Sequence, residues 1–246
     1  EKVMALELGY GMNYKYFNAK LNAYYTTWKD KALLSRSFQD PVSGNDTRAF
    51  IKGLDAIHKG VEFELGMRPV KGLLLETVVS VGDWQWTSRD SAEVVDDQTN
   101  TVVDVVYFDA VGIKVGDAAQ LQFRQSARWE IIDGLSVRAS FTYFGNHYSN
   151  FDPLTLDPNK YPESFDTEGN PRQSWEIPAF YMIDAGIGYS WRTKDATKFK
   201  VQFTVLNLLD EIYISDARNN DGYTGQSTNN FDAASAGVFF GMGRRF

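Results

Sequence analysis

Along the last segment of the chain, an apolar face alternates with a mostly small or polar face, and this alternation restricts the fold more than any other feature. Its two faces carry Phe246, Arg244, Met242, Phe240, Val238 and Ala236 on one side, and Arg245, Gly243, Gly241, Phe239, Gly237 and Ser235 on the other. Successive side chains of a strand point to opposite sides of a sheet, so the segment is predicted to be a strand. A soluble core strand would turn Lys, Glu or Thr to water instead of glycine. The pattern therefore favours a barrel wall that faces lipid.

The same two-residue period recurs along the whole chain. We count about nine such segments, each with room for the ~9–11 residues with which a tilted strand crosses a bilayer. They cover residues 4–13, 17–25, 61–67, 73–81, 121–129, 135–143, 181–191, 199–205 and 236–246. No apolar run approaches the ~20 residues of a spanning helix. The predicted fold class is all-β, an antiparallel transmembrane β-barrel segment.

The connections between these segments alternate in length. Short turns are predicted near residues 14–16, 68–72, 131–134 and 192–198, and long polar loops at about 29–56, 84–118, 145–178 and 209–232. Outer-membrane barrels have short periplasmic turns and long extracellular loops. All seven prolines fall in turns, in loops or at a strand edge, where they remove no ladder hydrogen bond.

Aromatic residues gather at both ends of the apolar faces, as expected for the two aromatic girdles of a membrane barrel. On the short-turn side these are Tyr14, Tyr16, Phe17, Trp129, Tyr189, Trp191, Phe199 and Phe246, and on the long-loop side Tyr25, Trp28, Tyr143 and Tyr181. Soluble sandwiches and lipocalin-like barrels also have alternating strands. These soluble folds lack such girdles. Loops longer than ~12–15 residues are also uncommon in compact domains, so the membrane barrel is favoured.

Composition excludes several classes of function. The net charge of −7 argues against a nucleic-acid partner, which would require clustered Lys and Arg. The chain has no cysteine, and its two histidines, His58 and His147, have no metal-ligand spacing. Nucleophile motifs and complete glycine-rich phosphate loops are missing as well. We therefore predict that the chain is not an enzyme, has no catalytic residue, holds no metal and requires no cofactor.

The number of strands indicates that the barrel is incomplete. Bacterial barrels have an even number of strands, and an unpaired edge would leave N–H and C=O groups without partners in lipid. About nine strands therefore predict a portion of a larger barrel.

Several stretches resemble the last third of a TonB-dependent outer-membrane receptor, of the kind common in Bacteroidetes. They are residues 6–10, 21–30, 115–120, 151–153, 177–184 and 205–213. The most specific is Asn207-Leu208-Leu209-Asp210 followed by Tyr213, before a final loop and a terminal Phe strand. The resemblance covers nearly the whole chain. Arg244 departs from it, because an apolar residue is expected at this lipid-facing position near the interface.

The resemblance implies a 22-stranded barrel around an amino-terminal plug. Residues 1–246 would be its carboxyl-terminal portion, and the plug and remaining strands would be absent from this chain. The implied activity is energy-coupled uptake of a nutrient such as a siderophore, vitamin or oligosaccharide in the bacterial outer membrane. Implied partners are outer-membrane lipid, the missing strands and plug, the TonB complex and a surface lipoprotein. A passive channel or a structural barrel subunit of an envelope assembly is the alternative, and a plug with a TonB box would decide between them.

Ligand contacts are expected on the upper lumen wall and the long loops, where aromatic rings offer stacking area. The candidates are Trp84, Trp86, His147, Tyr148, Trp175 and Tyr223, although Trp84 and Trp86 also fit a girdle or loop packing. Charges of both signs are predicted to face the lumen, namely Glu62, Glu64, Glu76, Arg124, Arg128, Arg138 and Lys200. Phe240, Met242 and Phe246 are predicted to lie at the membrane interface on the closing strand.

Overall fold

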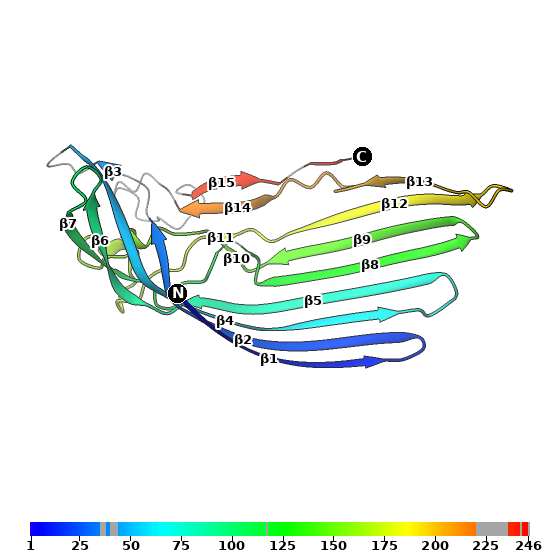
Figure 1. Cartoon of the computed structure of the whole chain (residues 1–246), viewed down its shortest axis with the longest axis horizontal. Coiled ribbons are helices and arrows are strands. Elements are labelled where there is room, and N and C mark those ends of the chain that lie inside the picture. The colour runs from blue at the N-terminus through cyan, green and yellow to red at the C-terminus, as the bar shows by residue number, and fades with distance from the viewer. Residues whose placement is uncertain (35–37, 40–43, 117, 220–235, 242, 246) are drawn as a thin grey trace.

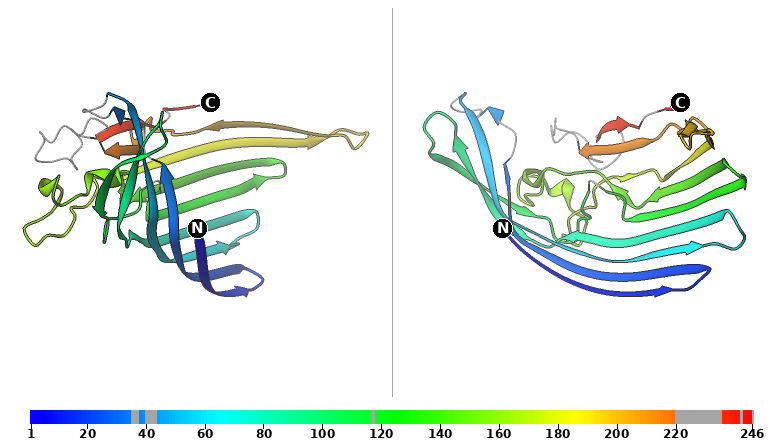
Figure 2. Two further views of the ribbon diagram at one scale, coloured as in Figure 1. Left: turned by 60° about the vertical axis from the view of Figure 1, so that its left-hand side comes forward. Right: turned by 45° about the vertical axis from the view of Figure 1, so that its right-hand side comes forward.

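The computed structural model describes residues 1–34, 38–39, 44–116, 118–219, 236–241 and 243–245. One curved antiparallel sheet dominates the chain (Figures 1 and 2). Its neighbouring strands are, in order, β1 (Lys2–Asn13), β2 (Phe17–Leu34), β4 (Asp46–Met67), β5 (Leu73–Trp86), β8 (Leu121–Ile132), β9 (Leu135–Gly145), β12 (Phe180–Arg192) and β13 (Lys198–Val205). These eight strands contain eight of the predicted segments, and the all-β antiparallel prediction is confirmed.

The remaining elements belong to the long connections. They are β3 (Phe38–Gln39), β6 (Arg89–Asp96), β7 (Val102–Asp109), β10 (His147–Tyr148), β11 (Glu176–Ile177), β14 (Ile214–Asn219), β15 (Ala236–Phe240) and the 3₁₀ helices η1 (Pro153–Thr155) and η2 (Pro162–Ser164). Both helices are single turns, and in the described part of the chain none is long and apolar enough to span a membrane.

Short turns join the strands at one end of the sheet, and the long connections gather at the other end (Figure 1). Gly72 and Gly134 adopt positive φ angles of 82° and 80° in two of these turns, a conformation that favours glycine. The hairpins are staggered. Phe17 at the start of β2 pairs with Met67, the last residue of β4, whereas Leu73 at the start of β5 pairs with Trp129 inside β8. Such stagger accompanies the strand tilt of a barrel wall.

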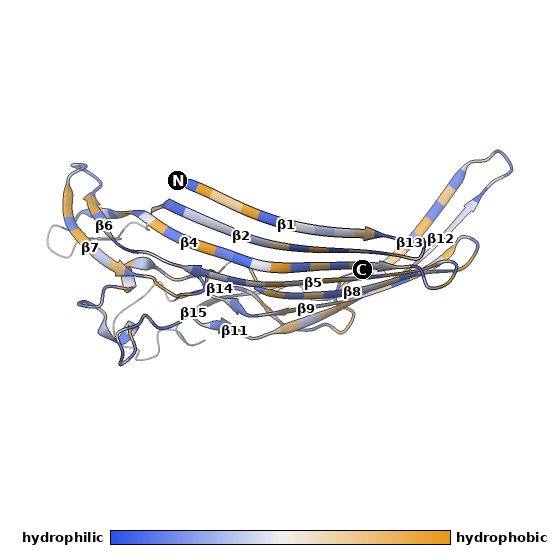
Figure 3. Cartoon of the chain, turned by 90° about the horizontal axis from the view of Figure 1, so that it is seen from below, coloured by the Kyte–Doolittle hydropathy of each residue, from blue (hydrophilic) through white to orange (hydrophobic). Residues whose placement is uncertain are grey.

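Strand register separates the predicted faces. One ladder row joins Tyr10, Leu21, Phe63, Val79 and Phe123, and the apolar face to which it belongs is largely exposed, with Leu8 at 78%. The opposite face carries the row Asn22, Glu62, Ser80 and Gln122. Figure 3 shows the resulting alternation of apolar and polar bands along β1 and β4. A single-layer sheet with an exposed apolar face is the expected form of a lipid-facing wall.

Side-chain burial shows which face is the inner one. The main buried cluster consists of Ala49, Ile51, Leu54, Ala56, Trp86, Ala92, Val94, Val106, Phe108, Ala110, Ile113 and Leu156. Trp28, Phe151 and Leu154 pack against it. Ala56 and Trp86 lie on the same sheet face as Glu62 and Ser80, so the loop segment around Leu156 folds over that face. The polar face is therefore the lumen side, and the core lies at the long-loop end.

The predicted long loops are more ordered than expected, and this corrects their description as polar loops. β2 and β4 continue beyond the apolar band, and β6 and β7 form a hairpin that pairs with upper β4. Likewise, β10, β11, η1 and η2 lie within the loop predicted at 145–178. Backbone ladders continue wherever a neighbouring strand supplies partners, with or without lipid.

The last predicted strand also differs from expectation. β15 ends at Phe240 and pairs with β14, which lies in the loop predicted at 209–232. Beyond it, Arg245 forms an isolated bridge with Leu206. Phe240 is 66% exposed, and its place at the membrane interface stays a prediction. Met242 and Phe246, the other two residues of the predicted closing strand, lie outside the described residues.

The short-turn girdle has the expected exposed rings. Tyr189, Trp191 and Phe199 form a continuous stack with centroid separations of 5.6 and 5.5 Å. On the long-loop side, the assignment of Trp28 to the girdle is wrong. Trp28 pairs with Ala56, and this register places it on the opposite face from Tyr25, inside the wall. The period of two along β2 is the physical reason, because an odd residue and an even residue cannot share a face.

Candidate functional site

An aromatic cluster lines the inner wall just below the loops. Tyr24 of β2, His58 of β4 and Trp84 of β5 come from three adjacent strands, and their register places them on the lumen face. The Trp84 indole Nε1 donates a hydrogen bond to the Tyr24 hydroxyl at 2.8 Å. The His58 ring lies between Trp28 and Trp84, with centroid distances of 6.3 and 5.5 Å. We call Tyr24, Trp28, His58 and Trp84 the wall cluster.

Two paired glycines leave room for this cluster. Gly60 of β4 and Gly82 of β5 are directly opposite one another. A Cβ at Gly60 would lie 2.5 Å from the Tyr24 hydroxyl oxygen, and one at Gly82 would lie 2.7 Å from Trp84 Nε1. The hydrogen-bonded Tyr24 and Trp84 side chains therefore lie over the glycine pair. They can occupy this position because neither glycine has a Cβ.

Trp86 has a different role from Trp84, although only Gln85 lies between them. It is 8% exposed, belongs to the buried loop cluster and meets Phe151 edge to face at 6.1 Å. The Lys31 ammonium lies over the rings of both Trp28 and Trp86, at 5.7 and 5.5 Å from their centroids. Trp86 thus joins the wall cluster to the loop core, and its ring is largely unavailable to a ligand.

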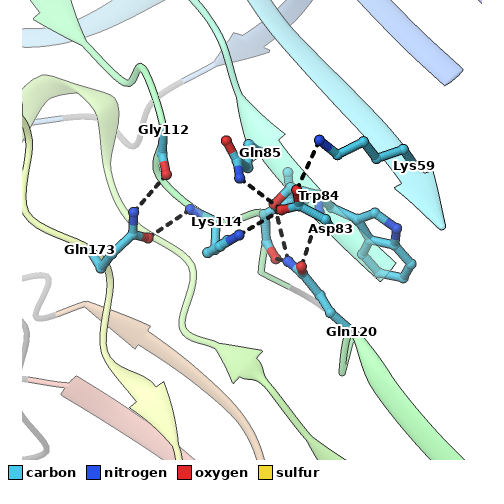
Figure 4. Close-up of polar contacts among 9 residues, drawn as sticks. Lys59, Asp83, Trp84, Gln85, Gly112, Lys114, Gln120 and Gln173 are labelled. Atoms are coloured by element: carbon cyan, nitrogen blue, oxygen red, sulfur yellow. Dashed lines mark hydrogen bonds and ion pairs between the residues drawn. The ribbon is translucent and has the colours of Figure 1, made fainter. Parts of the chain in front are cut away.

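Glutamine side chains bond the upper end of β5 and the 112–114 segment beside it (Figure 4). Gln120 accepts a hydrogen bond from Trp84 N at 3.0 Å and donates to the Trp84 carbonyl oxygen at 3.1 Å. Gln173 accepts from Lys114 N at 2.9 Å and donates to the Gly112 carbonyl oxygen at 2.6 Å. β5 pairs with β8 only as far as Val81, and beyond it the Gln120 amide and the bridge between Gln85 and Lys114 bond the β5 backbone. The loops therefore hold the backbone of Trp84 in place.

Asp83 is the charged centre of the same region. It lies beyond Val81, on the loop side of the apolar band, and its carboxylate oxygens face Lys114 Nζ at 2.6 Å and Lys59 Nζ at 3.1 Å. Its hydrogen bond with Lys114, aided by bonds with Lys59 and Gln85, lowers the pKa of Asp83 to about 2. The carboxylate is therefore ionised at any physiological pH and fixes Lys114 against β5.

Acidification is expected to release the 110–120 segment from β5. The folded pKa of Asp83 lies below its ordinary value of 3.8, so its contribution to stability is fully present above that value and is lost as the pH falls through about 2. Pepsin cleavage within this segment should therefore be slower in the native protein than in Asp83→Asn at pH about 4. The two rates should converge as the pH approaches 2. Equal rates at both pH values would contradict this assignment.

Three further predicted ligand residues lie in the 145–178 connection. His147 and Tyr148 form β10, which pairs with Ile177 and Glu176 of β11. His147 is buried, Tyr148 and Trp175 are partly exposed, and Ser149 N donates to the Trp175 carbonyl oxygen at 2.9 Å. Burial raises the pKa of Tyr148, with Glu176 and Asp83 adding to the effect, so its phenol remains protonated. Tyr223 lies outside the described residues.

Sequence reasoning missed Tyr24 and His58 as site residues and placed Trp28 on the wrong face. The available signal was parity, since even-numbered residues of β2, β4 and β5 share the lumen face with Trp84. Their proximity depends on the pairing register, which the sequence does not state. Within the described ranges, no three His, Cys, Asp or Glu side chains are placed to hold a metal ion together.

A family comparison agrees with this architecture. The family model described as "TonB dependent receptor-like, beta-barrel" matches residues 1–208. A search of curated proteins returned no match.

Three solved structures, two of receptors and one of a transporter, have the same fold. The ferric preacinetobactin receptor BauA from Acinetobacter baumannii superposes with a TM-score of 0.58 at 16% identity, over 98% of this chain and 28% of its own. The siderophore receptor PiuA from Acinetobacter baumannii gives 0.59 at 13% identity, over 98% and 27%. The copper transporter OprC gives 0.55 at 14% identity, over 98% and 30%. The chain therefore spans less than a third of the length of each of these proteins.

Proposed function

Because the chain belongs to the TonB-dependent receptor β-barrel family, we propose that it is the carboxyl-terminal part of a receptor that imports a nutrient with energy supplied through TonB. The family consists of non-enzymatic transporters of the outer membrane, and the chain is located there. The proposal includes an amino-terminal plug and further strands that complete the barrel. A surface lipoprotein is proposed as an additional partner at the loop end.

The wall cluster is the observation that best supports uptake of a specific ligand. Tyr24, His58 and Trp84 face the lumen at the end where a ligand arrives from outside. Indole and phenol rings held by a hydrogen bond and by paired glycines offer rigid stacking area at low entropic cost. We therefore propose a ligand with flat or ring-shaped apolar faces, which includes catechol siderophores, ring-containing vitamins and oligosaccharides.

The proposed contact residues fall into two groups. Trp84, Tyr148 and Trp175 are partly exposed and are proposed to touch the ligand. Trp86 and His147 are buried, so their proposed part is to hold the contacting segments in position. Tyr223 remains a proposed contact on grounds of sequence alone. Tyr24 and His58 are added because they share the wall with Trp84.

Trp84→Ala is expected to weaken uptake of the natural ligand about tenfold, because a lost aromatic stacking contact costs roughly 0.5–1.5 kcal/mol beyond the area it buries. The measurement is uptake of radiolabelled candidate ligands by cells expressing the complete receptor, over a range of concentrations. Trp191→Ala is the matched control, since this indole faces outward at the short-turn end. It should leave the apparent affinity unchanged.

The same assay in cells without TonB tests the proposed energy coupling. Uptake should fall to the background of a strain lacking the receptor. Uptake that continues unchanged without TonB would refute the proposal and favour the passive channel. If both tryptophan variants behave like the native receptor, the wall cluster is not the ligand site.

A further inference from the structure

A second group of stacked aromatic rings lies on the wall, apart from the wall cluster. Phe144 of β9 and Phe180 of β12 pair directly, and the centroids of their rings are 5.0 Å apart. Tyr213, the residue before β14, stacks on Phe180 at a centroid distance of 4.3 Å, with the two ring planes 17° apart. All three side chains are partly exposed. We call Phe144, Phe180 and Tyr213 the lumen stack.

A glycine supports the lumen stack, as two glycines support the wall cluster. A Cβ at Gly241 would overlap the Tyr213 ring, and Gly241 N donates a hydrogen bond to the Tyr213 carbonyl oxygen at 2.9 Å. The stacked neighbours and the glycine backbone restrict these rings. Like the wall cluster, they offer stacking area to a ligand at low entropic cost.

One row of the strand ladder connects the lumen stack with the region below the wall cluster. Gly60 and Gly82, which the Tyr24 and Trp84 rings cover, occupy the next lumen-facing row toward the loops. The two groups of rings therefore flank the same set of polar side chains. From β2 to β12, the connecting row consists of Asn22, Glu62, Ser80, Gln122, Phe144 and Phe180, all on the lumen face.

The polar side chains of this row are suited to bind the hydroxyl groups of a ligand. In the described part of the chain, the side chains of Glu62 and Ser80 form no hydrogen bond or ion pair. Gln122 Nε2 donates to the Ala119 carbonyl oxygen at 3.0 Å, which holds the Gln122 amide in the row. A carboxylate, a hydroxyl and an amide can each accept a hydrogen bond from a ligand hydroxyl.

The charge of the row disfavours an anionic ligand. Glu62 is the one charged side chain among its six residues. Arg124, the next lumen-facing residue of β8, lies one row closer to the short turns. An anion bound along the row would therefore face a carboxylate at close range. A neutral ligand with many hydroxyl groups meets no such repulsion.

The distance between the two groups of rings requires an extended ligand. Trp84 belongs to β5 and Phe180 to β12, and three strand spacings separate these strands, or roughly 14 Å at ~4.8 Å per spacing. A single flat ring spans only a fraction of this distance. A ligand that contacts both groups therefore contains at least two rings.

We propose that the lumen stack is a second contact site for the imported ligand, and that this ligand is a linear oligosaccharide. One sugar ring lies on the wall cluster and another on the lumen stack, and the hydroxyl groups between them bond to Glu62, Ser80 and Gln122. Sugar rings combine C–H faces that pack on aromatic rings with hydroxyl groups at their edges. This inference rests on the proposed function, which supplies an imported ligand, and narrows the class of that ligand.

The test measures ligand affinity by titration calorimetry of the complete receptor in detergent micelles. The probes are linear oligosaccharides of glucose, xylose, mannose and galactose, each as disaccharide and hexasaccharide, together with ferric enterobactin and cyanocobalamin. Phe180→Ala removes the central ring of the lumen stack, and Phe180→Trp keeps a ring there. Tyr181→Ala is the matched control, because this neighbouring ring of β12 is 39% exposed on the outer face and stacks on Phe141. Heat-modifiable gel mobility confirms that each barrel is folded.

The native receptor should bind the hexasaccharide of at least one series more tightly than its disaccharide, because only the longer chain reaches both groups of rings. Phe180→Ala should weaken hexasaccharide binding about tenfold and leave disaccharide binding unchanged. Phe180→Trp and Tyr181→Ala should retain the native affinity. Glu62→Gln should bind the hexasaccharide several-fold more weakly, because an amide is a weaker acceptor than a carboxylate.

Four results would overturn the inference. They are native hexasaccharide affinity in Phe180→Ala, equal weakening of both chain lengths by this variant, unchanged or tighter binding by Glu62→Gln, and binding of ferric enterobactin or cyanocobalamin without binding of any oligosaccharide. None of these results concerns energy coupling, so the proposed function can survive them. Uptake that is independent of TonB refutes the proposed function, while the affinities measured in micelles still report on the lumen stack.

Discussion

Leu21→Arg is expected to destabilise the folded barrel by about 2–4 kcal/mol, the cost of a cationic side chain near the bilayer midplane. Leu21 lies on the outer face of β2, midway between the girdle residues Phe17 and Tyr25, and is 47% exposed. Its ladder neighbours are Tyr10 and Phe63, both apolar. An arginine there has no partner, and either interface is several residues away.

Asn22→Arg is the matched control, because it adds the same side chain one residue further along β2. Asn22 faces the lumen and pairs with Gly9 and Glu62, so the new charge meets an opposite charge and water. Urea unfolding of the complete receptor in micelles gives the free energy of unfolding of each variant. Similar destabilisation by the two variants would contradict the assignment of the faces, and a larger effect of Asn22→Arg would reverse it.

The second large effect is expected in the loops, where Leu156→Ala should cost about 2–5 kcal/mol of local stability through the cavity it leaves. Leu156 is 0% exposed and packs in the cluster with Phe108 and Ile113. Its carbonyl oxygen accepts a hydrogen bond from Asp109 N at 3.0 Å, which joins the 145–178 connection to β7. Loss of its side chain therefore loosens two loops at once.

Hydrogen exchange separates this local effect from unfolding of the barrel. The amides of β6 and β7 should exchange faster in Leu156→Ala, while those of β8 and β9 keep their native protection. Leu154→Ala is the control, since Leu154 only packs against the margin of the cluster. Exchange that accelerates equally in β8 would mean that the loops and the wall unfold together.

The membrane wall was predictable because its signal is local. A strand places every second side chain on the same face, so the apolar positions of β1 and β12 identify their outer faces without knowledge of their neighbours. The short turns at Gly72 and Gly134 were equally visible, because a short connection permits only a hairpin.

The loop region was much less predictable. β6 and β7 were read as parts of a polar loop, yet they form a hairpin whose buried face packs on Ile51 and Leu54 of upper β4. Their own alternation is present in the sequence, but the charged residues Asp90, Glu93 and Asp96 lie within it, and the whole stretch was predicted as part of the polar loop at 84–118. Distant residues such as Leu156 make the burial possible.

The candidate site was also predictable only in part. Trp84 was selected from the sequence as an aromatic residue near a strand end, and the structure places it on the lumen wall. Tyr24 and His58 were missed because their contact with Trp84 depends on the register of three strands. Trp86 was selected for the same reason as Trp84, and only the packing of Phe151 and Ile113 shows that it is buried.

The sequence by itself determined that this chain is a lipid-facing β wall with short turns at one end, since a period of two and a glycine turn are properties of neighbouring residues. Only the tertiary structure decided that the long loops contain a common core, that Tyr24 and His58 lie beside Trp84 and that cations from separate hairpins meet at the short-turn end of the lumen wall. Each of these depends on how strands are staggered and which distant segments cover them. Stagger and coverage arise from contacts between residues far apart in the chain, and these contacts cannot be inferred from the local periodicity of the sequence.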